Sequence, residues 1–488
     1  MSTELFHSRQ SEFSIYFSYP WKSIQTGYII LTWIVLGFHV ELVGPTIPTL
    51  AASIHSHYTE MGALTAVRSL GYLIANCLGI FLQHTVDNHS YPVLTCGFIL
   101  PAIVMFSVPF VKSVILLYVL FFFQGVSLSL TDIAGTHLLL TIWGIDSAPP
   151  LGAMHTGYGI GALLAILLVR PFLIETGASV NHMSSEKFNI IGPYLIAGSL
   201  CTLIALGNLF FAFREAKNKR ERLEFKQSDY GTLTSNGGQD EEVPSPYSPR
   251  TFGYGDYRYG LTLCIIFICY MFFVGGNDHT FGFFFFTYLK LDKLNLSNSA
   301  ANWGNILFWI ANIVCVRNRL RNTNNFVGRL LVCVLAIYFS TFTLSNIAWF
   351  GSLYVAVLWL LWIWSSDWII AQLLILGTFT GLAMAPLVQL SLAFINERLK
   401  VTPVLIAYVY SGSALGALVF HQTTGYIMDH DPNYFPTLFF ISTLAAILLY
   451  ILSNGVYYFH RRKNLSNAQS SDTATATLLP ENLDRETK

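Results

Sequence analysis

Residues 259–289 read YGLTLCIIFICYMFFVGGNDHTFGFFFFTYL, an apolar stretch with the acid Asp278 inside it. About 20 apolar residues in a helix match the thickness of the hydrocarbon core of a bilayer. An ionised side chain in that core is costly unless it is paired or in contact with water. The stretch therefore predicts a membrane-spanning helix, and its acid indicates that something polar is handled at membrane depth.

The composition extends this prediction to the whole chain. Of 488 residues, 53% are hydrophobic and only 11% are charged, whereas a soluble domain has roughly 25% charged residues. We therefore expect an integral membrane protein. Positive and negative residues balance at 27 each, so no basic excess indicates a nucleic-acid partner. The sequence has no nucleotide-binding glycine loop, HExxH or GxSxG, so we expect no enzyme, no catalytic residue, no metal site and no cofactor.

The apolar segments predict an all-α membrane protein with twelve spans in two six-helix halves, 27–213 and 259–459. A polar cytoplasmic linker, 214–258, joins the halves, and the ends are a cytoplasmic N-terminus, 1–26, and a disordered tail, 460–488. By hydropathy, the spans lie near 27–51, 62–83, 91–112, 114–140, 149–173, 190–213, 259–289, 298–338, 344–364, 367–393, 401–427 and 435–459.

Basic residues predict the orientation of these spans. Lys and Arg cluster in the linker, at Arg398 and Lys400, and at 461–463 after the last span. In a twelve-span count these positions share one side of the membrane, which the positive-inside rule assigns to the cytoplasm. We therefore expect both termini in the cytosol.

The region from Asn302 to Trp364 complicates the count. It holds too much apolar sequence for two spans, and the polar run 317–325 interrupts it. Taken literally, the region gives thirteen spans. An odd number would put the basic residues 461–463 outside the cell, against the charge rule, so we prefer an eighth span broken by an insertion.

Three acids lie on predicted helix faces that are lined with small residues. Residues three, four or seven apart share a face. Small neighbours let a second helix or a ligand approach closely. Each acid on such a face could form a buried pair that holds helices together, or could belong to a site for an ion or polar solute. Because three acids share this pattern, we favour the site. The sets are Glu41 with Gly37 and Gly44, Asp132 with Gly125 and Ser129, and Asp278 with Gly275 and Gly282.

Other polar side chains within spans are further candidates. Arg68 in the second span needs an acid as partner, which we expect in the first or fourth span, unless its side chain reaches the membrane surface. His155 in the fifth span could relay protons, because histidine titrates near neutrality, or could be a packing residue. Asn277 could hydrogen-bond a solute, while Tyr72 or Trp303 could stack on a sugar ring or simply pack.

Several of these stretches resemble one branch of a transporter family. Residues 276–282, GNDHTFG, resemble its Gly-x-acid-x-x-aromatic-Gly signature in the seventh span. Residues 68–73, RSLGYL, are similar to its second span, the stripe from Gly125 to Asp132 to its fourth, and His155 with 158–164 to its fifth. This is the fucose-permease-like branch of the major facilitator superfamily, which includes the sodium-dependent glucose transporter 1 group.

The eighth span departs from that branch. The branch usually has Phe-Trp, five residues and then Gly-Arg, whereas here Gly328-Arg329 follows Phe308-Trp309 thirteen residues later than that spacing. Removing 314–326 would restore both the spacing and a twelve-span count. The loop after Gly79 also lacks the basic residues of the superfamily's usual loop motif.

The resemblance implies secondary active transport of a small polar solute, a hexose, by alternating access, coupled to a sodium ion or a proton, with uniport as the alternative. It implies a monomer in the plasma membrane, with the sugar and the lipid bilayer as partners. Two other functions stay open: a non-transporting receptor or scaffold, and a lipid-handling carrier. The candidate substrate- or ion-binding residues are Glu41, Arg68, Tyr72, Asp132, His155, Asn277, Asp278 and Trp303.

Overall fold

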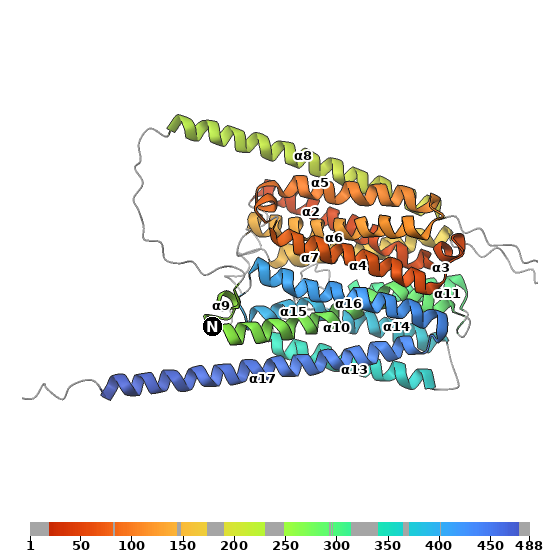
Figure 1. Ribbon diagram of the computed structural model, residues 1–488. Helices are drawn as coiled ribbons and strands as arrows, with labels where there is room; N and C mark the ends of the chain where they lie inside the picture. Colours follow the sequence, from red (N-terminus) through yellow and green to blue (C-terminus); the bar gives the residue numbers. More distant parts are fainter. Residues whose placement is uncertain are drawn as a thin grey trace, which may run out of the picture.

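The computed structural model describes residues 19–81, 83–143, 148–172, 190–229, 248–291, 294, 296–313, 340–364, 370–400 and 402–477. All elements in this part of the chain are helices, packed side by side in a bundle (Figure 1). The predicted all-α fold is confirmed. The predicted insertion, 314–326, and the Gly328-Arg329 pair lie outside the described residues.

The N-terminal half, as we call helices α2 to α8, begins with a broken span. Together, α2 and α3 cover the predicted span 27–51, and the later helices cover the next five predicted spans. The bounds are α2 Pro20–Glu41, α3 Val43–Ser53, α4 Tyr58–Phe81, α5 Gln83–Ser107, η1 Val108–Phe110, α6 Val114–Trp143, α7 Ala148–Val169, η3 Arg170–Phe172 and α8 Ile191–Asp229.

The C-terminal half comprises helices α9 to α17. Its tenth predicted span, 367–393, is broken between α14 and α15 at Ala385 and Pro386, because a proline inside a helix removes a backbone donor and crowds the preceding turn. The bounds are α9 Pro249–Phe252, α10 Tyr257–Lys290, α11 Asn298–Ile313, α13 Thr341–Trp364, α14 Ile370–Met384, α15 Leu387–Asn396, α16 Pro403–His430 and α17 Tyr434–Thr477.

Two segments predicted as linker and disordered tail are helical instead. Residues 214–229 of the linker continue α8, because their many Arg, Glu and Lys residues are strong helix formers. Residues 460–477 of the tail continue α17. Extending an existing helix needs no new nucleation, and neither Gly nor Pro interrupts this stretch.

The predicted number of spans is not reached among the described residues. Ten helical stretches there are long and apolar enough to cross a membrane, with α2 and α3 counted as one. By contrast, α11 has 16 residues and α14 has 15. The count of twelve therefore stays a prediction.

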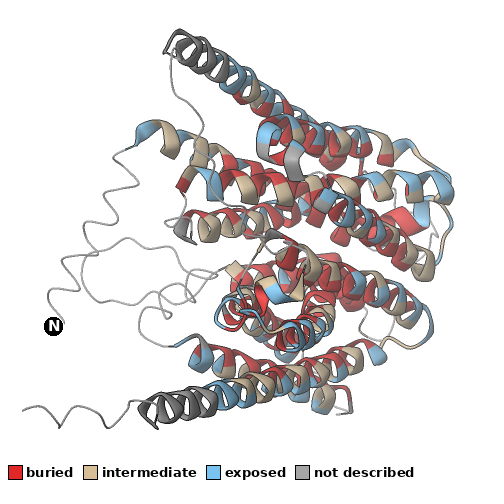
Figure 2. Ribbon diagram, turned by 60° about the vertical axis from the view of Figure 1, so that its left-hand side comes forward, coloured by how far each residue is buried: buried red, intermediate tan, exposed pale blue. Residues whose placement is uncertain are grey.

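The two halves meet along three pairs of helices. α4 packs against α16, α3 against α10, and α7 against α11. Buried residues line the faces of the helices that turn toward the interior (Figure 2). Within the N-terminal half, a Cβ atom at Gly125 would lie 1.8 Å from Arg68 O, so α6 touches the backbone of α4. The glycine on the face of Asp132 thus makes a helix contact.

The basic segments after the sixth and the last predicted spans emerge at one end of the bundle. The far end of α8, helix α9 and the far end of α17 all lie there, at the left in Figure 1. At this end, which we call the linker end, His460 Nδ1 is 3.6 Å from Asp256 Oδ2. Since the described parts of α8 and α17 end at the same end of the bundle, their placement favours the even span count predicted from the sequence over thirteen.

Candidate functional site

Glu41 lies at the break in the first transmembrane stretch. α2 ends at Glu41 and α3 begins at Val43. Pro45 explains the break, because proline has no N–H and its ring crowds the carbonyl four residues earlier, which is that of Glu41. The Glu41 side chain is buried. The local sequence therefore places a carboxylate and a backbone carbonyl without its usual helical donor at one buried point.

Arg68 of α4 lies beside Glu41 where the halves meet. Its Nη1 donates to Val40 O at 3.4 Å, and its guanidinium carbon is 4.9 Å from the centre of the Phe283 ring of α10. Glu41 is the strongest charge partner of Arg68, and Glu41 Oε1 accepts a hydrogen bond of 2.7 Å from Tyr158 OH. Arg68 is 5% exposed. This geometry favours an Arg68 that interacts with Glu41 of the first span over an Arg68 whose side chain extends to the membrane surface.

Two buried histidines near Arg68 were missed by prediction from the sequence. Both His39 of α2 and His421 of α16 lie within electrostatic reach of the guanidinium. His39 Nδ1 is 3.3 Å from Gln124 Nε2, and His421 Nδ1 is 3.4 Å from Ser69 Oγ. The signal that selected His155, a titratable side chain inside an apolar span, was present for both.

Asp132 of α6 pairs with Tyr72 of α4. Tyr72 OH donates to Asp132 Oδ2 at 3.1 Å, and Tyr410 of α16 lies within electrostatic reach of Tyr72. One turn further along α4, Asn76 Nδ2 donates to Ala407 O at 3.2 Å. This acid therefore also lies near the contact between the halves, closer to the linker end than Arg68.

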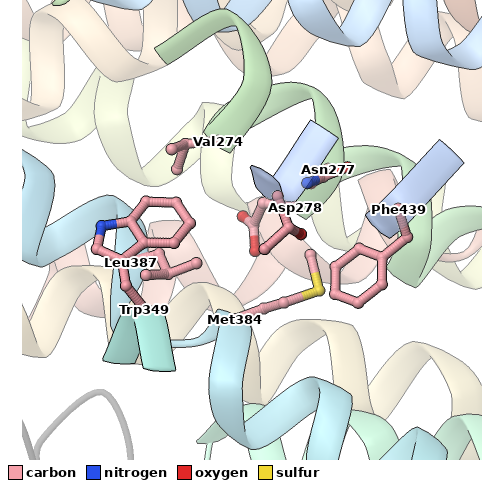
Figure 3. Close-up of a pocket in the computed structure, with 8 residues that line it drawn as sticks. Val274, Asn277, Asp278, Trp349, Met384, Leu387 and Phe439 are labelled. Atoms are coloured by element: carbon pink, nitrogen blue, oxygen red, sulfur yellow. The ribbon is translucent and has the colours of Figure 1, made fainter. Parts of the chain in front are cut away.

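Asp278 and Asn277 of α10 line a small pocket inside the C-terminal half (Figure 3). Ser442 Oγ donates to Asn277 Oδ1 at 2.6 Å. The cavity of about 10 Å³ has room for about one water molecule, so no hexose fits in this closed conformation. The other lining residues are Val274, Trp349, Met384, Leu387, Phe439 and Thr443.

Trp303 lies apart from that pocket. The residue is 43% exposed, and the Arg170 guanidinium carbon is 4.7 Å from the centre of its ring. His155 is half-buried on α7, one turn before Tyr158. In the described part of the chain, no group of three or more His, Cys, Asp or Glu side chains is arranged to hold a metal ion.

The halves are held together at the end opposite the linker end. Asp429, near the end of α16, accepts hydrogen bonds from Tyr58 N at 2.9 Å, from Thr59 N at 2.6 Å and from Thr59 Oγ1 at 2.6 Å. The N–H groups of the first turn of α4 have no partner within the helix. One turn on, a Cβ atom at Gly62 would lie 2.8 Å from Gly425 Cα. With Asn76 bonded to α16 as well, α4 and α16 touch near both ends.

The bundle with buried charges where its halves meet has known counterparts. A family model described as Major Facilitator Superfamily matches residues 29–358. The chain belongs to the major facilitator superfamily. As expected, it is a multi-pass membrane protein of a transporter family and not an enzyme.

Within the superfamily, the resemblance to the sodium-dependent glucose transporter 1 group is confirmed. The chain is 26% identical over 458 residues to "Sodium-dependent glucose transporter 1" of Homo sapiens, covering 86% of this chain and 77% of the relative. It is 24% identical over 441 residues to "Sodium-dependent glucose transporter 1A" of Mus musculus, covering 86% and 93%.

Solved structures show the same fold. A D-xylose-proton symporter superposes with a TM-score of 0.59 at 14% identity, covering 87% of this chain and 96% of the other. The nucleoside transporter NupG superposes with a TM-score of 0.57 at 12% identity, covering 89% and 98%.

Proposed function

We propose that this member of the superfamily is a secondary active transporter of a small polar solute, a hexose, coupled to a sodium ion or a proton. Its two halves, 27–213 and 259–459, rock about a site near the middle of the membrane. We also propose that it is a monomer in the plasma membrane, with the linker end and both termini in the cytosol.

The observation that supports this proposal best is the Glu41–Arg68 group at the contact between the halves. Charged side chains at membrane depth are costly and usually serve transport. Because Arg68 packs on Phe283 of the other half, rocking of the halves changes its surroundings. An alternating-access cycle can use that change to couple ion binding to movement.

Asp278 and Asp132 are the proposed ion-coupling residues. A carboxylate can take up a proton or ligate sodium, and in either case it loses its uncompensated charge before the site crosses the membrane. Asp278 lines the pocket, and Asp132 accepts a hydrogen bond from Tyr72, which lies within electrostatic reach of Tyr410 of α16. The names of the relatives, which include sodium dependence and glucose, support a sodium ion as the coupling ion and a hexose as the solute.

The pocket at Asp278 also favours a polar solute over a lipid. A lipid carrier needs an apolar cavity that opens sideways to the bilayer, whereas Asn277, Asp278 and Thr443 contribute to this pocket. The other alternative is a receptor or scaffold that does not transport. A counterflow experiment distinguishes it from a carrier.

Counterflow in proteoliposomes is the test. Vesicles that contain the full chain and unlabelled D-glucose should take up labelled D-glucose, while labelled L-glucose and protein-free vesicles provide the controls. A sodium gradient and a pH gradient, imposed separately, identify the coupling ion by which of them drives accumulation. Absence of counterflow for D-glucose, D-xylose and uridine would contradict the proposal and favour the scaffold.

A further inference from the structure

One face of α11 carries a row of buried asparagines. Residues three, four or seven apart share a helix face, and Asn298, Asn302, Asn305 and Asn312 follow this spacing. Their exposed fractions are 7%, 1%, 1% and 2%. Polar side chains are unfavourable on a helix face that contacts lipid, so this row faces the protein interior. Hydropathy alone does not explain why four asparagines lie there.

Three of these side chains have amide atoms without a hydrogen-bond partner among the described residues. They are both amide atoms of Asn302, Oδ1 of Asn305 and Oδ1 of Asn312. We call these three residues the asparagine stripe. A buried amide atom without a partner costs on the order of 1–3 kcal/mol, so each such atom in a native protein calls for an explanation, such as a functional role or a bound water or ion.

The stripe begins at the level of the pocket around Asp278. α10 and α11 run antiparallel: Gly282 lies against Trp309, and Leu289 lies against Gly304. The same register puts Asp278 level with Asn312. From there to Asn302 the helix rises about 15 Å, toward the end of the bundle where Asp429 caps α4. The stripe thus extends from the level of the pocket toward the end opposite the linker end.

We propose that the asparagine stripe is the hydroxyl-binding surface of the transport path and takes a neutral solute rich in hydroxyl groups. A carboxamide presents a donor and an acceptor side by side, as neighbouring hydroxyl groups of a polyol do. It adds no charge that would hold an ion in place. This inference rests on the proposed function and identifies the part of the chain that recognises the substrate.

The test uses isosteric variants of the full chain, Asn302→Leu and Asn305→Leu. Removing an unpaired buried amide should raise the melting temperature of the empty protein, because its desolvation cost disappears. The same change should weaken binding of hydroxylated solutes by at least about 10-fold, since their hydroxyl groups lose a buried partner. Binding is measured as the rise in melting temperature with D-glucose, myo-inositol, mannitol or uridine.

Asn208→Leu is the matched control. Asn208 on α8 is fully buried, and both its amide atoms also lack a partner among the described residues, but α8 lies on the far side of the N-terminal half. This variant should be as stabilised as the others while its response to solutes stays that of the unmodified chain.

The outcomes separate the two proposals. If the solutes still raise the melting temperature of Asn302→Leu and Asn305→Leu, the proposal that the stripe binds hydroxyl groups is wrong. It is also wrong if none of the four solutes raises the melting temperature of the unmodified chain. A response that the stripe variants lose, in a protein that shows no counterflow, supports the stripe and overturns the transport function.

Discussion

Arg68 is the side chain whose burial is hardest to explain without a partner. It packs between the halves, with Glu41 as its strongest charge partner and Phe283 beneath its guanidinium group. Arg68→Ala should lower the free energy of unfolding by about 3–5 kcal/mol, because it leaves the buried Glu41 without its positively charged neighbour. Chemical unfolding in detergent measures this loss.

The partner is identified by second substitutions in the Arg68→Ala protein. Glu41→Gln should recover part of the lost stability, whereas Asp132→Asn should not, since Asp132 pairs with Tyr72. Arg170→Ala serves as the control for an exposed arginine on an aromatic ring, and should change stability by at most about 1 kcal/mol. An unchanged stability of Arg68→Ala would show that its charge is solvated.

Asp278 and Asp132 should be needed for accumulation but not for exchange. In the protein with both Asp278→Asn and Asp132→Asn, neither position keeps a carboxylate that can bind a proton or a sodium ion. An ion gradient should therefore drive no concentrative uptake. Counterflow, which needs no gradient, should persist. Asp256→Asn at the exposed linker end is the control. Concentrative uptake at the level of the unmodified chain would remove both acids from the mechanism.

Among the elements, α4 depends on α16 for its N-terminal cap. Asp429→Ala removes the acceptor for the first-turn N–H groups of α4, so this end of the molecule should open more often. The measurement is the labelling rate of Thr65→Cys, a buried position further along α4, by a membrane-impermeant thiol reagent. We expect a rate at least about 5-fold higher, which corresponds to a cap worth about 1 kcal/mol.

Asp431→Ala is the matched control for this cap. Asp431 accepts from Asn433 N within its own turn, two residues beyond Asp429. Its loss should leave the labelling rate unchanged, and Asp429→Asn, which keeps an acceptor oxygen, should lie between the two. Equal rates for Asp429→Ala and the unmodified chain would mean that the cap does not control opening.

The cap of α10 makes the stability of the linker end depend on pH. Asp256 accepts from Tyr259 N at 3.1 Å, and this hydrogen bond is the main reason why its pKa is lowered, with His460 and Lys463 adding to it. A lowered pKa stabilises the fold above the unfolded value of about 3.9, and this contribution is lost as the pH falls through the folded value.

Asp256→Ala should therefore melt at a lower temperature than the unmodified chain at pH 7, and the gap should narrow as the pH falls from about 4 to 3. Asp256→Asn keeps a neutral cap, so its advantage over Asp256→Ala should not vary with pH. Thermal unfolding of the three proteins across this range is the measurement. A gap between the unmodified chain and Asp256→Ala that is constant with pH would exclude the ionised cap.

For the whole molecule, we expect the segment 314–326, which lies outside the described residues, to interrupt the eighth span. It contains Arg317, Arg319 and Arg321, and each arginine costs about 2.5–3.5 kcal/mol at the centre of a membrane helix. We expect its deletion to raise expression, because Phe308-Trp309 then reaches Gly328-Arg329 within one span. Fluorescence of a C-terminal tag measures expression.

Protease protection of the same tag in vesicles of both orientations measures topology. The tag should be cytosolic with or without the segment, since α8 and α17 leave the bundle at the same end. An extracellular tag on the full-length chain would contradict this arrangement.

Much of the fold could be predicted from the sequence because span length and charge are properties of single segments. A stretch such as 259–289 is long and apolar enough to cross a bilayer whatever its neighbours are, and α10 spans almost the same residues. Asp278 and Arg68 could be selected as candidates for the same reason, since an ionised group in an apolar segment is costly wherever the segment packs.

Only the tertiary structure decided which of these side chains meet. The sequence allowed an acid from the first or the fourth span beside Arg68. In the structure Glu41 of the first span is its strongest charge partner, whereas Asp132 of the fourth span is hydrogen-bonded to Tyr72. It also brought His39 and His421 to the same guanidinium and revealed the unpaired amides of the asparagine stripe. Hydropathy acts residue by residue, whereas pairing depends on which helix faces touch, and contacts between residues far apart in the chain determine that.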